Sequence, residues 1–230
     1  MQVAILVGGK GTRLKPLTDD TPKPMVLVNG KPFLYYLVEY FKKKGVDDII
    51  FLTGYMSEKI EDYFGDGSDF GIKIRYSVES KPLGTAGAIR NAYELLDDEF
   101  IVVNGDTLVE FDLQGFVENH KNKDNPISML IIRKVGKRFG NIKVEKDIVS
   151  GFSEKENPTG FINAGIYLLN KSVLDKIEED MFISIENDVF PKYVGKMTAF
   201  MTDGYFIDIG TIDTYEEFKK DILELEKRLL

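Results

Sequence analysis

The sequence contains no cysteine and a single histidine, His120, among its 230 residues. Without cysteine the chain has no disulfide, no thiolate nucleophile, no iron–sulfur cluster and no cysteine-bound zinc. One histidine excludes a multi-histidine metal centre, and the polar run Glu118–Asn122 around it predicts a solvated helix end rather than a catalytic group. Any metal is therefore expected to bind through oxygen ligands, which favours Mg²⁺.

Long hydrophobic runs and excess positive charge are also missing. Met129–Ile132 is typical of the longest apolar runs, far short of the 18 or more residues of a membrane span. The N-terminus shows no basic region or cleavage site, so we expect no secretory signal, no membrane partner and a cytoplasmic location. The net charge of −8 argues against nucleic acid as a partner. It is compatible with a phosphorylated small molecule, because a few cations in a cleft decide that.

Glycines gather beside two cations near the start of the chain. The run Gly8-Gly9-Lys10-Gly11-Thr12-Arg13-Leu14 follows the apolar segment Val3–Val7, a pattern that predicts a strand opening into a loop. Backbone N–H groups of such a loop form an anion cradle. Arg13 adds a planar charged fork, and Lys23 adds a point charge between two prolines. The loop is therefore predicted to hold a polyphosphate.

The spacing of this loop differs from two common phosphate-binding motifs. Counting G-x-G-x-x-G from Gly9 leads to Leu14 instead of a third glycine, which disfavours a nicotinamide dehydrogenase. A P-loop needs Gly-Lys-Ser/Thr, but Lys10 precedes Gly11 and no such triplet follows. A plain connecting turn is the simpler alternative, and it leaves Arg13 and the proline-flanked Lys23 without a purpose.

Strand-like and helix-like segments alternate through the first half of the chain. This pattern predicts a parallel sheet with helices on both faces, in which ligands bind beyond the carboxyl ends of the strands. The expected strands are Val3–Val7, Ile49–Thr53, Ile72–Val78 and Phe100–Asn104, and the expected helices are Pro32–Lys44, Ser57–Phe64 with Ser57 as its cap, Ala86–Leu96 and Leu113–Lys121.

Strands with short turns dominate the second half and predict an added antiparallel lobe. The expected elements are strands Ile127–Arg133, Asn141–Glu145, Val149–Ser153 and Ile162–Leu169, helical pieces Lys171–Glu178 and Ile185–Val194, strands Met197–Met201 and Tyr205–Ile209, and a last helix after the capping box Thr214–Glu217. We predict a single α/β domain over residues 1–230, a three-layer α/β/α sandwich with a Rossmann-like, mixed and mostly parallel sheet.

The last helix carries an apolar stripe with a spacing of three or four residues. This stripe favours packing on the chain's own surface over a dimer seam, so a homo-oligomer is left open. The stripe consists of Tyr215, Phe218, Ile222, Leu225 and Leu229.

Two aspartates follow predicted strands at opposite ends of the chain. Asp106 lies in Asn104-Gly105-Asp106-Thr107, after the apolar run Phe100–Val103, and Asp208 ends another apolar run. Carboxylates at one sheet edge could hold Mg²⁺ through one or two oxygens each and leave positions for phosphate and water. Alternatively, each aspartate serves only its own turn.

The run GGKGTRLKPLTDDTPKPM at residues 8–25 resembles the N-terminal motif of the sugar-1-phosphate nucleotidyltransferases. Further likenesses follow in the family's order, at Pro82–Ile89, Arg138–Ile142, Phe152–Lys155 and Phe161–Tyr167, so the resemblance extends from Ala4 to about Thr214. It implies an enzyme of nucleotide-sugar biosynthesis, serving capsule or lipopolysaccharide, that uses a nucleoside triphosphate, a sugar 1-phosphate and Mg²⁺. The nucleotide would bind in the half at about 1–110 and the sugar in the half at about 111–230.

The resemblance also implies roles for individual residues. Catalytic roles fall to Arg13, Lys23 and Lys155, and metal binding to Asp106 and Asp208. The other implied contacts are, for the nucleotide, Leu6, Gly8, Gly9, Gly11, Thr12, Arg13, Lys23, Glu79, Pro82, Gly84 and Thr85, and, for the sugar, Asn104, Gly140, Glu154, Lys155 and Asn163.

Within the family the segments most resemble the heptose- or mannose-1-phosphate guanylyltransferases. GTP and D-glycero-D-manno-heptose 1-phosphate are therefore the first choice of substrates. Glucose 1-phosphate or N-acetylmuramate 1-phosphate with UTP or dTTP is the alternative. A paralogue that binds nucleotide-sugar without turnover is a second alternative, against which the intact Arg13, Lys23, Asp106, Lys155 and Asp208 argue.

Overall fold

A computed structural model describes residues 1–133, 141–153 and 160–229 of the chain. It divides into two compact units. Unit 1 comprises Met1–Pro82, Val103–Leu108 and Phe206–Leu230, and unit 2 comprises Leu83–Val102 and Val109–Tyr205. The chain passes from unit 2 to unit 1 within strand β6 (Glu99–Asn104).

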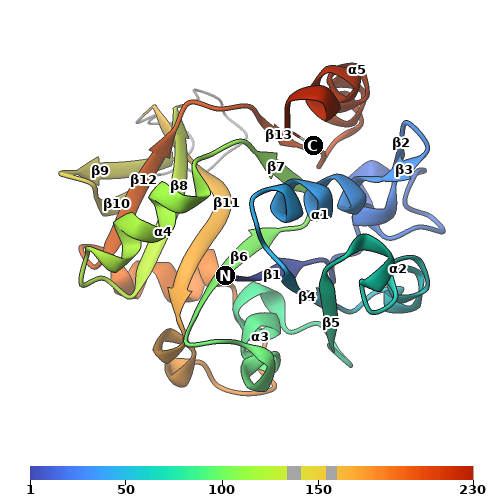
Figure 1. Cartoon of the computed structure of the whole chain (residues 1–230). Helices are drawn as coiled ribbons and strands as arrows, with labels where there is room; N and C mark the ends of the chain where they lie inside the picture. The colour runs from blue at the N-terminus through green and yellow to red at the C-terminus, as the bar shows by residue number, and fades with distance from the viewer. Residues whose placement is uncertain (134–140, 154–159, 230) are drawn as a thin grey trace. The chain divides into compact units, whose positions relative to one another are not determined.

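Unit 1 is built on three parallel strands in the order β5-β4-β1 (Figure 1). These strands are β1 (Gln2–Leu6), β4 (Asp48–Thr53) and β5 (Lys73–Val78). Their Val, Ile and Leu side chains are buried almost without alternation in β1 and β4, which is typical of parallel strands covered on both faces. Short pairs complete the unit, β2 (Leu27–Val28) with β3 (Lys31–Pro32) and β7 (Thr107–Val109) with β13 (Phe206–Asp208).

Aromatic side chains attach the helices of unit 1 to each other and to the strands. The helices are α1 (Phe33–Lys43), α2 (Ser57–Phe64) and α5 (Ile212–Leu229). Phe33 of α1 meets Phe218 of α5 edge-on at a ring distance of 5.0 Å, and Phe51 of β4 meets Phe64 of α2 at 5.2 Å. Such edge-on pairs add stabilisation beyond the buried area alone.

Unit 2 contains mostly antiparallel strands in the order β11-β8-β12-β10-β9. β8 (Ile127–Arg133) pairs antiparallel with β11 (Phe161–Asn170) and parallel with β12 (Met197–Thr202). β9 (Asn141–Glu145) and β10 (Ile148–Ser153) form a hairpin, α4 (Leu113–Lys121) packs on β8 and β12, and α3 (Gly84–Asn91) begins the unit. The protein is thus a mixed α/β fold with a mixed sheet, the class that the sequence predicts. The division into a nucleotide half and a sugar half stays a prediction.

Several predicted helices are shorter or different in type. The segment predicted as Ala86–Leu96 is α3 followed by a separate 3₁₀ turn at Tyr93–Leu95, where Tyr93 bonds Asp175 through its hydroxyl. The predicted helix Ile185–Val194 is a π turn at Ile185–Val189 and a 3₁₀ turn at Phe190–Tyr193. Pro191 follows the π turn and has no N–H group with which an α-helix could continue.

Other helix boundaries also differ from the sequence prediction. The segment Lys171–Lys176 is a 3₁₀ helix, and α2 has Met56 rather than Ser57 as its cap residue. The last helix begins at Ile212, where the backbone N–H of Thr214 donates to the Thr211 hydroxyl at 3.4 Å. Thr211 therefore takes the capping role expected of Thr214.

His120 is buried, so the prediction of a solvated helix end is wrong. Only 1% of its surface is exposed, because Leu113, Phe116 and His120 share the buried face of α4 at helical spacing. Its Nδ1 lies 2.8 Å from the Ser128 hydroxyl and its Nε2 lies 2.7 Å from Asn170 Oδ1. The histidine is a hydrogen-bonded core residue of unit 2.

Four of the five residues in the apolar stripe of α5 are buried within the chain. Phe218 and Ile222 are fully buried, and Tyr215 and Leu225 are nearly so. These four residues therefore pack on their own unit, as the sequence predicts. No helix in the part of the chain that the structure describes is long and apolar enough to cross a membrane.

Candidate functional site

Gly11 allows the glycine loop to lie directly against Lys23. Its φ is +62°, a left-handed conformation that other residues adopt at a cost. A Cβ at Gly11 would lie 2.6 Å from Cβ of Lys23. The Gly11 carbonyl accepts hydrogen bonds from the Thr18 hydroxyl at 2.9 Å and from Leu14 N–H at 3.0 Å. Both predicted phosphate-binding segments are therefore parts of one packed structure in unit 1.

Packing accounts for Gly8 but not for Gly9. A Cβ at Gly8 would lie 3.0 Å from Glu79 Oε1, so Glu79, whose N–H donates to the Thr53 carbonyl at 2.9 Å, lies beside the loop. A Cβ at Gly9 would have no described atom within 4 Å. Gly9 is exposed and offers a ligand direct access to the backbone.

The two cations of the loop have different surroundings. Lys23 Nζ forms an ion pair with Asp106, and the exposed fractions of the two side chains are 12% and 26%. Arg13, on the 3₁₀ turn Thr12–Leu14, is exposed and has no ion-pair partner among the residues that the structure describes. Lys23 is thus held in place, while Arg13 is available to an anion.

The two predicted metal-binding aspartates lie on hydrogen-bonded segments of unit 1. The Asp106 carbonyl accepts from Ile209 N–H at 2.9 Å, next to Asp208, and Gly105 N–H donates to the Leu6 carbonyl at 3.0 Å. Asp208 Oδ1 accepts from Gly210 N–H at 2.5 Å, so the carboxylate also serves its own turn. This arrangement places both aspartates beside the end of β1, from which the glycine loop continues.

The carboxylates of Asp106 and Asp208 suit a hard cation that is bound by few protein ligands. Carboxylate oxygens are the ligands that Mg²⁺ prefers, and Mg²⁺ commonly keeps water and substrate phosphate as its other ligands. Within residues 1–133, 141–153 and 160–229, no group of three or more acidic, histidine or cysteine side chains could hold a metal ion. A two-carboxylate site completed by phosphate is therefore the type that fits.

The remaining predicted residues are distributed over the chain. In unit 1, Asn104 is half-buried at the end of β6, whereas Thr12 and Pro82 are exposed. Gly84, Thr85 and Asn163 belong to unit 2. Three predicted sugar contacts, Gly140, Glu154 and Lys155, lie outside the described residues.

The start of α3 in unit 2 is closed by the chain itself. Gly84 has φ +71°, and a Cβ there would lie 2.6 Å from the carbonyl oxygen of Ile183. This carbonyl accepts from the N–H groups of Ala86 and Gly87 at 2.9 and 3.3 Å. Close packing therefore explains Gly84, and these two N–H groups are already hydrogen-bonded.

Glu186 was not singled out by the sequence analysis. Its carboxylate accepts from the Thr85 hydroxyl at 3.1 Å and from the Tyr167 hydroxyl at 3.4 Å. Tyr167 in turn accepts from Asn163 Nδ2 at 2.7 Å. The signal available in the sequence was a polar run, Ser184–Asp188, interrupted only by Ile185.

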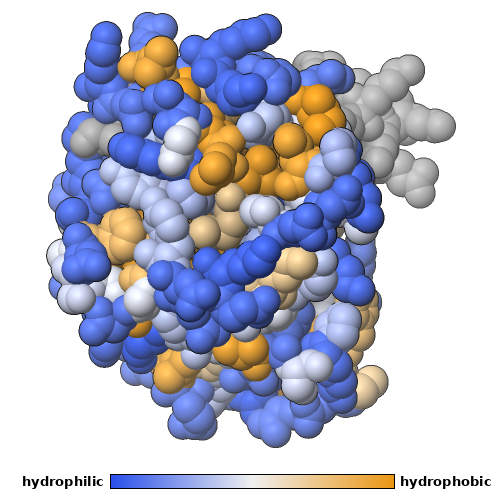
Figure 2. Space-filling view, turned by 90° about the vertical axis from the view of Figure 1, so that its right-hand side faces the viewer, coloured by the Kyte–Doolittle hydropathy of each residue, from blue (hydrophilic) through white to orange (hydrophobic). Residues whose placement is uncertain are grey.

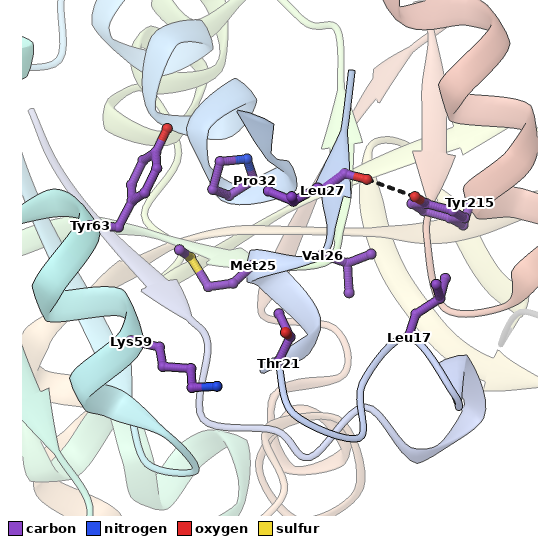
Figure 3. Close-up of a pocket in the computed structure, with 9 residues that line it drawn as sticks. All are labelled: Leu17, Thr21, Met25, Val26, Leu27, Pro32, Lys59, Tyr63 and Tyr215. Carbon is purple, nitrogen blue, oxygen red and sulfur yellow. Dashed lines mark hydrogen bonds between the residues drawn. The ribbon is translucent and has the colours of Figure 1, made fainter. Parts of the chain in front are cut away.

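Unit 1 also contains a pocket of about 430 Å³, and none of the predicted site residues is among the residues that line it (Figure 3). Met25, Leu27 and Tyr215 are among its lining residues, and Lys59 is its single charged one. Tyr215 donates to the Leu27 carbonyl at 2.6 Å, and burial raises the pKa of Tyr215. Because its wall is mainly apolar, this pocket does not suit a phosphate group.

The surface around this pocket is partly hydrophobic. Leu27 is 57% exposed, and Figure 2 shows hydrophobic residues gathered on the face that it displays. Single exposed apolar residues are common on proteins.

Comparison with known proteins assigns the family. The model of a family described as nucleotidyl transferase matches residues 2–224. The chain belongs to the nucleotidyl transferase family. The match runs through both units, so the glycine loop and the start of α3 lie within one family domain.

Individual relatives of this nucleotidyltransferase are similar along nearly their whole length. The D-glycero-alpha-D-manno-heptose 1-phosphate guanylyltransferase of Campylobacter jejuni is 40% identical, with 95% of this chain and 98% of the relative covered. The enzyme of the same name from Aneurinibacillus thermoaerophilus is 38% identical, with 96% and 98% covered. The crystal structure of HddC from Yersinia pseudotuberculosis complexed with GMP-PN has a TM-score of 0.85 and 37% identity, with 96% and 99% covered.

Replacement of Gly84 by alanine tests whether close packing against the Ile183 carbonyl requires glycine at this position. A left-handed φ costs a non-glycine residue about 1 kcal/mol, and the collision with the Ile183 carbonyl is expected to add about 1–3 kcal/mol. The control is Gly195→Ala, which has a similar φ of +80° but an open Cβ position. Urea denaturation is expected to show a larger loss for Gly84→Ala than for Gly195→Ala. Equal losses would contradict the packing explanation.

Proposed function

We propose that this nucleotidyltransferase transfers a guanylyl group from GTP to D-glycero-D-manno-heptose 1-phosphate and releases pyrophosphate. The observation that carries the proposal is the full-length likeness to two enzymes named for this sugar phosphate and for guanylyl transfer. The exposed glycine loop supports it, because Gly9 is open to a ligand and Arg13 has no acidic partner among the described residues.

The reaction requires alignment and charge neutralisation rather than a general base. A sugar 1-phosphate is ionised at neutral pH, so one of its phosphate oxygens can attack the α-phosphorus of GTP directly. The new oxygen–phosphorus bond forms as the bond to the β-phosphate bridging oxygen breaks, and pyrophosphate leaves with the electron pair. Positioned cations and backbone N–H groups stabilise the charge that develops. The absence of cysteine and the burial of the one histidine are compatible with this chemistry.

The triphosphate is assigned to the glycine loop. Backbone groups of Leu6, Gly8, Gly9, Gly11 and Thr12 would line it, with Arg13 and Lys23 supplying positive charge. Glu79, Pro82, Gly84 and Thr85 are assigned to the rest of the nucleotide. The ion pair with Asp106 supports the role of Lys23, since it holds the ammonium group beside the loop.

Magnesium is assigned to Asp106 and Asp208. Their positions on hydrogen-bonded segments next to β1 support the assignment. When bound, Mg²⁺ would neutralise part of the triphosphate charge. The aspartates themselves anchor the edge of the sheet, Asp106 through Lys23 and Asp208 through its own turn.

The sugar phosphate is assigned to five residues between Asn104 and Asn163. Lys155 would bind its phosphate, and Asn104, Gly140, Glu154 and Asn163 would contact the sugar. The assignment of Asn163 is supported by its oriented side-chain amide. The amide oxygen Oδ1 accepts from Gly165 N–H at 2.9 Å, and the amide nitrogen Nδ2 donates to the Tyr167 hydroxyl.

Turnover should require all three components of the reaction. We expect purified protein to release pyrophosphate only with a triphosphate, a sugar 1-phosphate and Mg²⁺ together, and mixtures that lack one component are the controls. Competition among equimolar GTP, ATP, UTP and dTTP is expected to favour GTP with the heptose phosphate. A clear preference for UTP or dTTP overturns the choice of base. Tight nucleotide-sugar binding without turnover would support the non-catalytic alternative.

Arg13→Ala should lower kcat by about 10²–10³-fold, the usual effect of removing one preorganised donor to developing charge. Arg13→Lys should also be impaired, because a point charge cannot replace a bidentate fork. The control is Lys15→Ala, which removes an exposed cation two positions away that pairs with Asp19. Near-normal kcat/KM in a folded Arg13→Ala variant would show that Arg13 is not part of the triphosphate site.

Asp208→Asn should raise the Mg²⁺ concentration needed for half-maximal rate by about tenfold or more, since an amide oxygen is a weaker ligand for Mg²⁺ than a carboxylate. Asp213→Asn, at an exposed aspartate in the first turn of α5, is the control. The measurement is a Mg²⁺ titration of initial rates at saturating substrates. An unchanged midpoint for Asp208→Asn would remove this residue from the metal site.

A further inference from the structure

We infer that Glu186 is a positioning residue that fixes Thr85 and Asn163 in one hydrogen-bonded unit, and that recognition of the sugar 1-phosphate depends on it through Asn163. The inference rests on the proposed function for the roles of Thr85 and Asn163. It does not depend on that function for the contacts themselves, which all lie within unit 2.

The Glu186 carboxylate collects hydroxyl donors from three segments of the chain. Its Oε2 accepts from the hydroxyls of Thr85 and Ser184 at 3.1 and 3.2 Å, and its Oε1 accepts from the Tyr167 hydroxyl at 3.4 Å. An ionised carboxylate can only accept hydrogen bonds. Each of the three hydroxyl hydrogens is therefore directed toward Glu186.

Because their hydrogens point toward Glu186, the hydroxyl oxygens of Thr85 and Tyr167 can accept hydrogen bonds from other groups. The Thr85 oxygen accepts from Ile185 N–H at 2.7 Å, and the Tyr167 oxygen accepts from Asn163 Nδ2 at 2.7 Å. Because Gly165 N–H donates to Asn163 Oδ1 at 2.9 Å, the amide of Asn163 is oriented at both ends. Glu186 thus sets the orientation of Asn163 through Tyr167.

The backbone that carries Glu186 is itself firmly held. Ser184 N–H donates to Asp188 Oδ2 at 2.7 Å, and Asp188 N–H donates to the Ser184 carbonyl at 2.9 Å. Glu186 lies in the π turn Ile185–Val189, a rare conformation that is frequent at functional sites. The Tyr167 ring is fully buried, 4.8 Å from the ring of Phe190. A rearrangement of the turn that carries Glu186 would therefore break backbone hydrogen bonds. A movement of the Tyr167 ring would disrupt packing in the core.

The charge of Glu186 argues against direct contact with the substrate phosphate. Two anions at close range repel each other, and this carboxylate already accepts three hydrogen bonds. Its effect on the sugar 1-phosphate is therefore transmitted through Tyr167 and Asn163. A side chain that only filled space would not need to accept hydrogen bonds from three hydroxyls.

Glu186→Gln keeps the shape but replaces one acceptor oxygen by a donor amide. We expect this variant to raise the KM for the sugar 1-phosphate about tenfold or more, since hydrogen bonds to a charged group are among the stronger ones in proteins. The kcat is expected to change less than KM. Tyr167→Phe should reproduce the effect, and the double variant should be no worse than either, because both break one connected path. Glu178→Gln, at an exposed glutamate of unit 2, is the matched control.

A second readout does not require turnover. The side-chain amide signal of Asn163, assigned by its loss in Asn163→Asp, is expected to shift in ¹⁵N-labelled Glu186→Gln and to stay in place in Glu178→Gln. A shifted signal without any turnover of the wild type would overturn the proposed function and leave the positioning contact standing. An unchanged signal, or an unchanged KM in an active enzyme whose variants fold normally, would overturn the role of Glu186.

Discussion

The ion pair between Lys23 and Asp106 is the contact on which the candidate site depends. It joins residues 83 positions apart, and both side chains are largely withdrawn from water, where an unpaired charge is costly. Gly11 must lack a side chain because Lys23 lies against it. Asp106 in turn holds Ile209 through its carbonyl. The loop, the end of β6 and the segment after β13 therefore share one anchor.

Glycine is needed at Gly9 and at Gly84, in the two glycine-rich motifs of this chain, for different physical reasons. Around Gly9 the space beside the backbone is open, whereas at Gly84 it is filled by the carbonyl of Ile183. A sequence pattern cannot distinguish these cases, since both read as small residues before a helix. The difference lies in a segment a hundred positions away, and only the folded chain reveals it. The helix start in unit 2 is best understood as a rigid support for Thr85.

The predictable features follow from local patterns. Alternating apolar strands and amphipathic helices predict the α/β class, and the ends of apolar runs predict that Asp106 and Asp208 lie at strand ends. The wrong or missing predictions concern long-range contacts. His120 lies in a locally polar sequence, but it shares the buried face of helix α4 with apolar residues. Its hydrogen-bond partners Ser128 and Asn170 lie on strands β8 and β11. The π turn that carries Glu186 depends on Thr85, a hundred positions earlier. The roles of the site residues stay predictions.

Unit 1 is assembled from the first and the last segments of the chain, and this order has a consequence for its biosynthesis. Tyr215 reaches Leu27 across 188 positions, and Asp208 comes from the same late segment. A ribosome makes the glycine loop first, yet the strand β13 and helix α5 that complete its unit are made only after all of unit 2. The contacts of Tyr215 with Leu27 and of Ile209 with Asp106 therefore cannot form until unit 2 has been made. The surroundings of the glycine loop are therefore completed only after every residue of unit 2 has been synthesised.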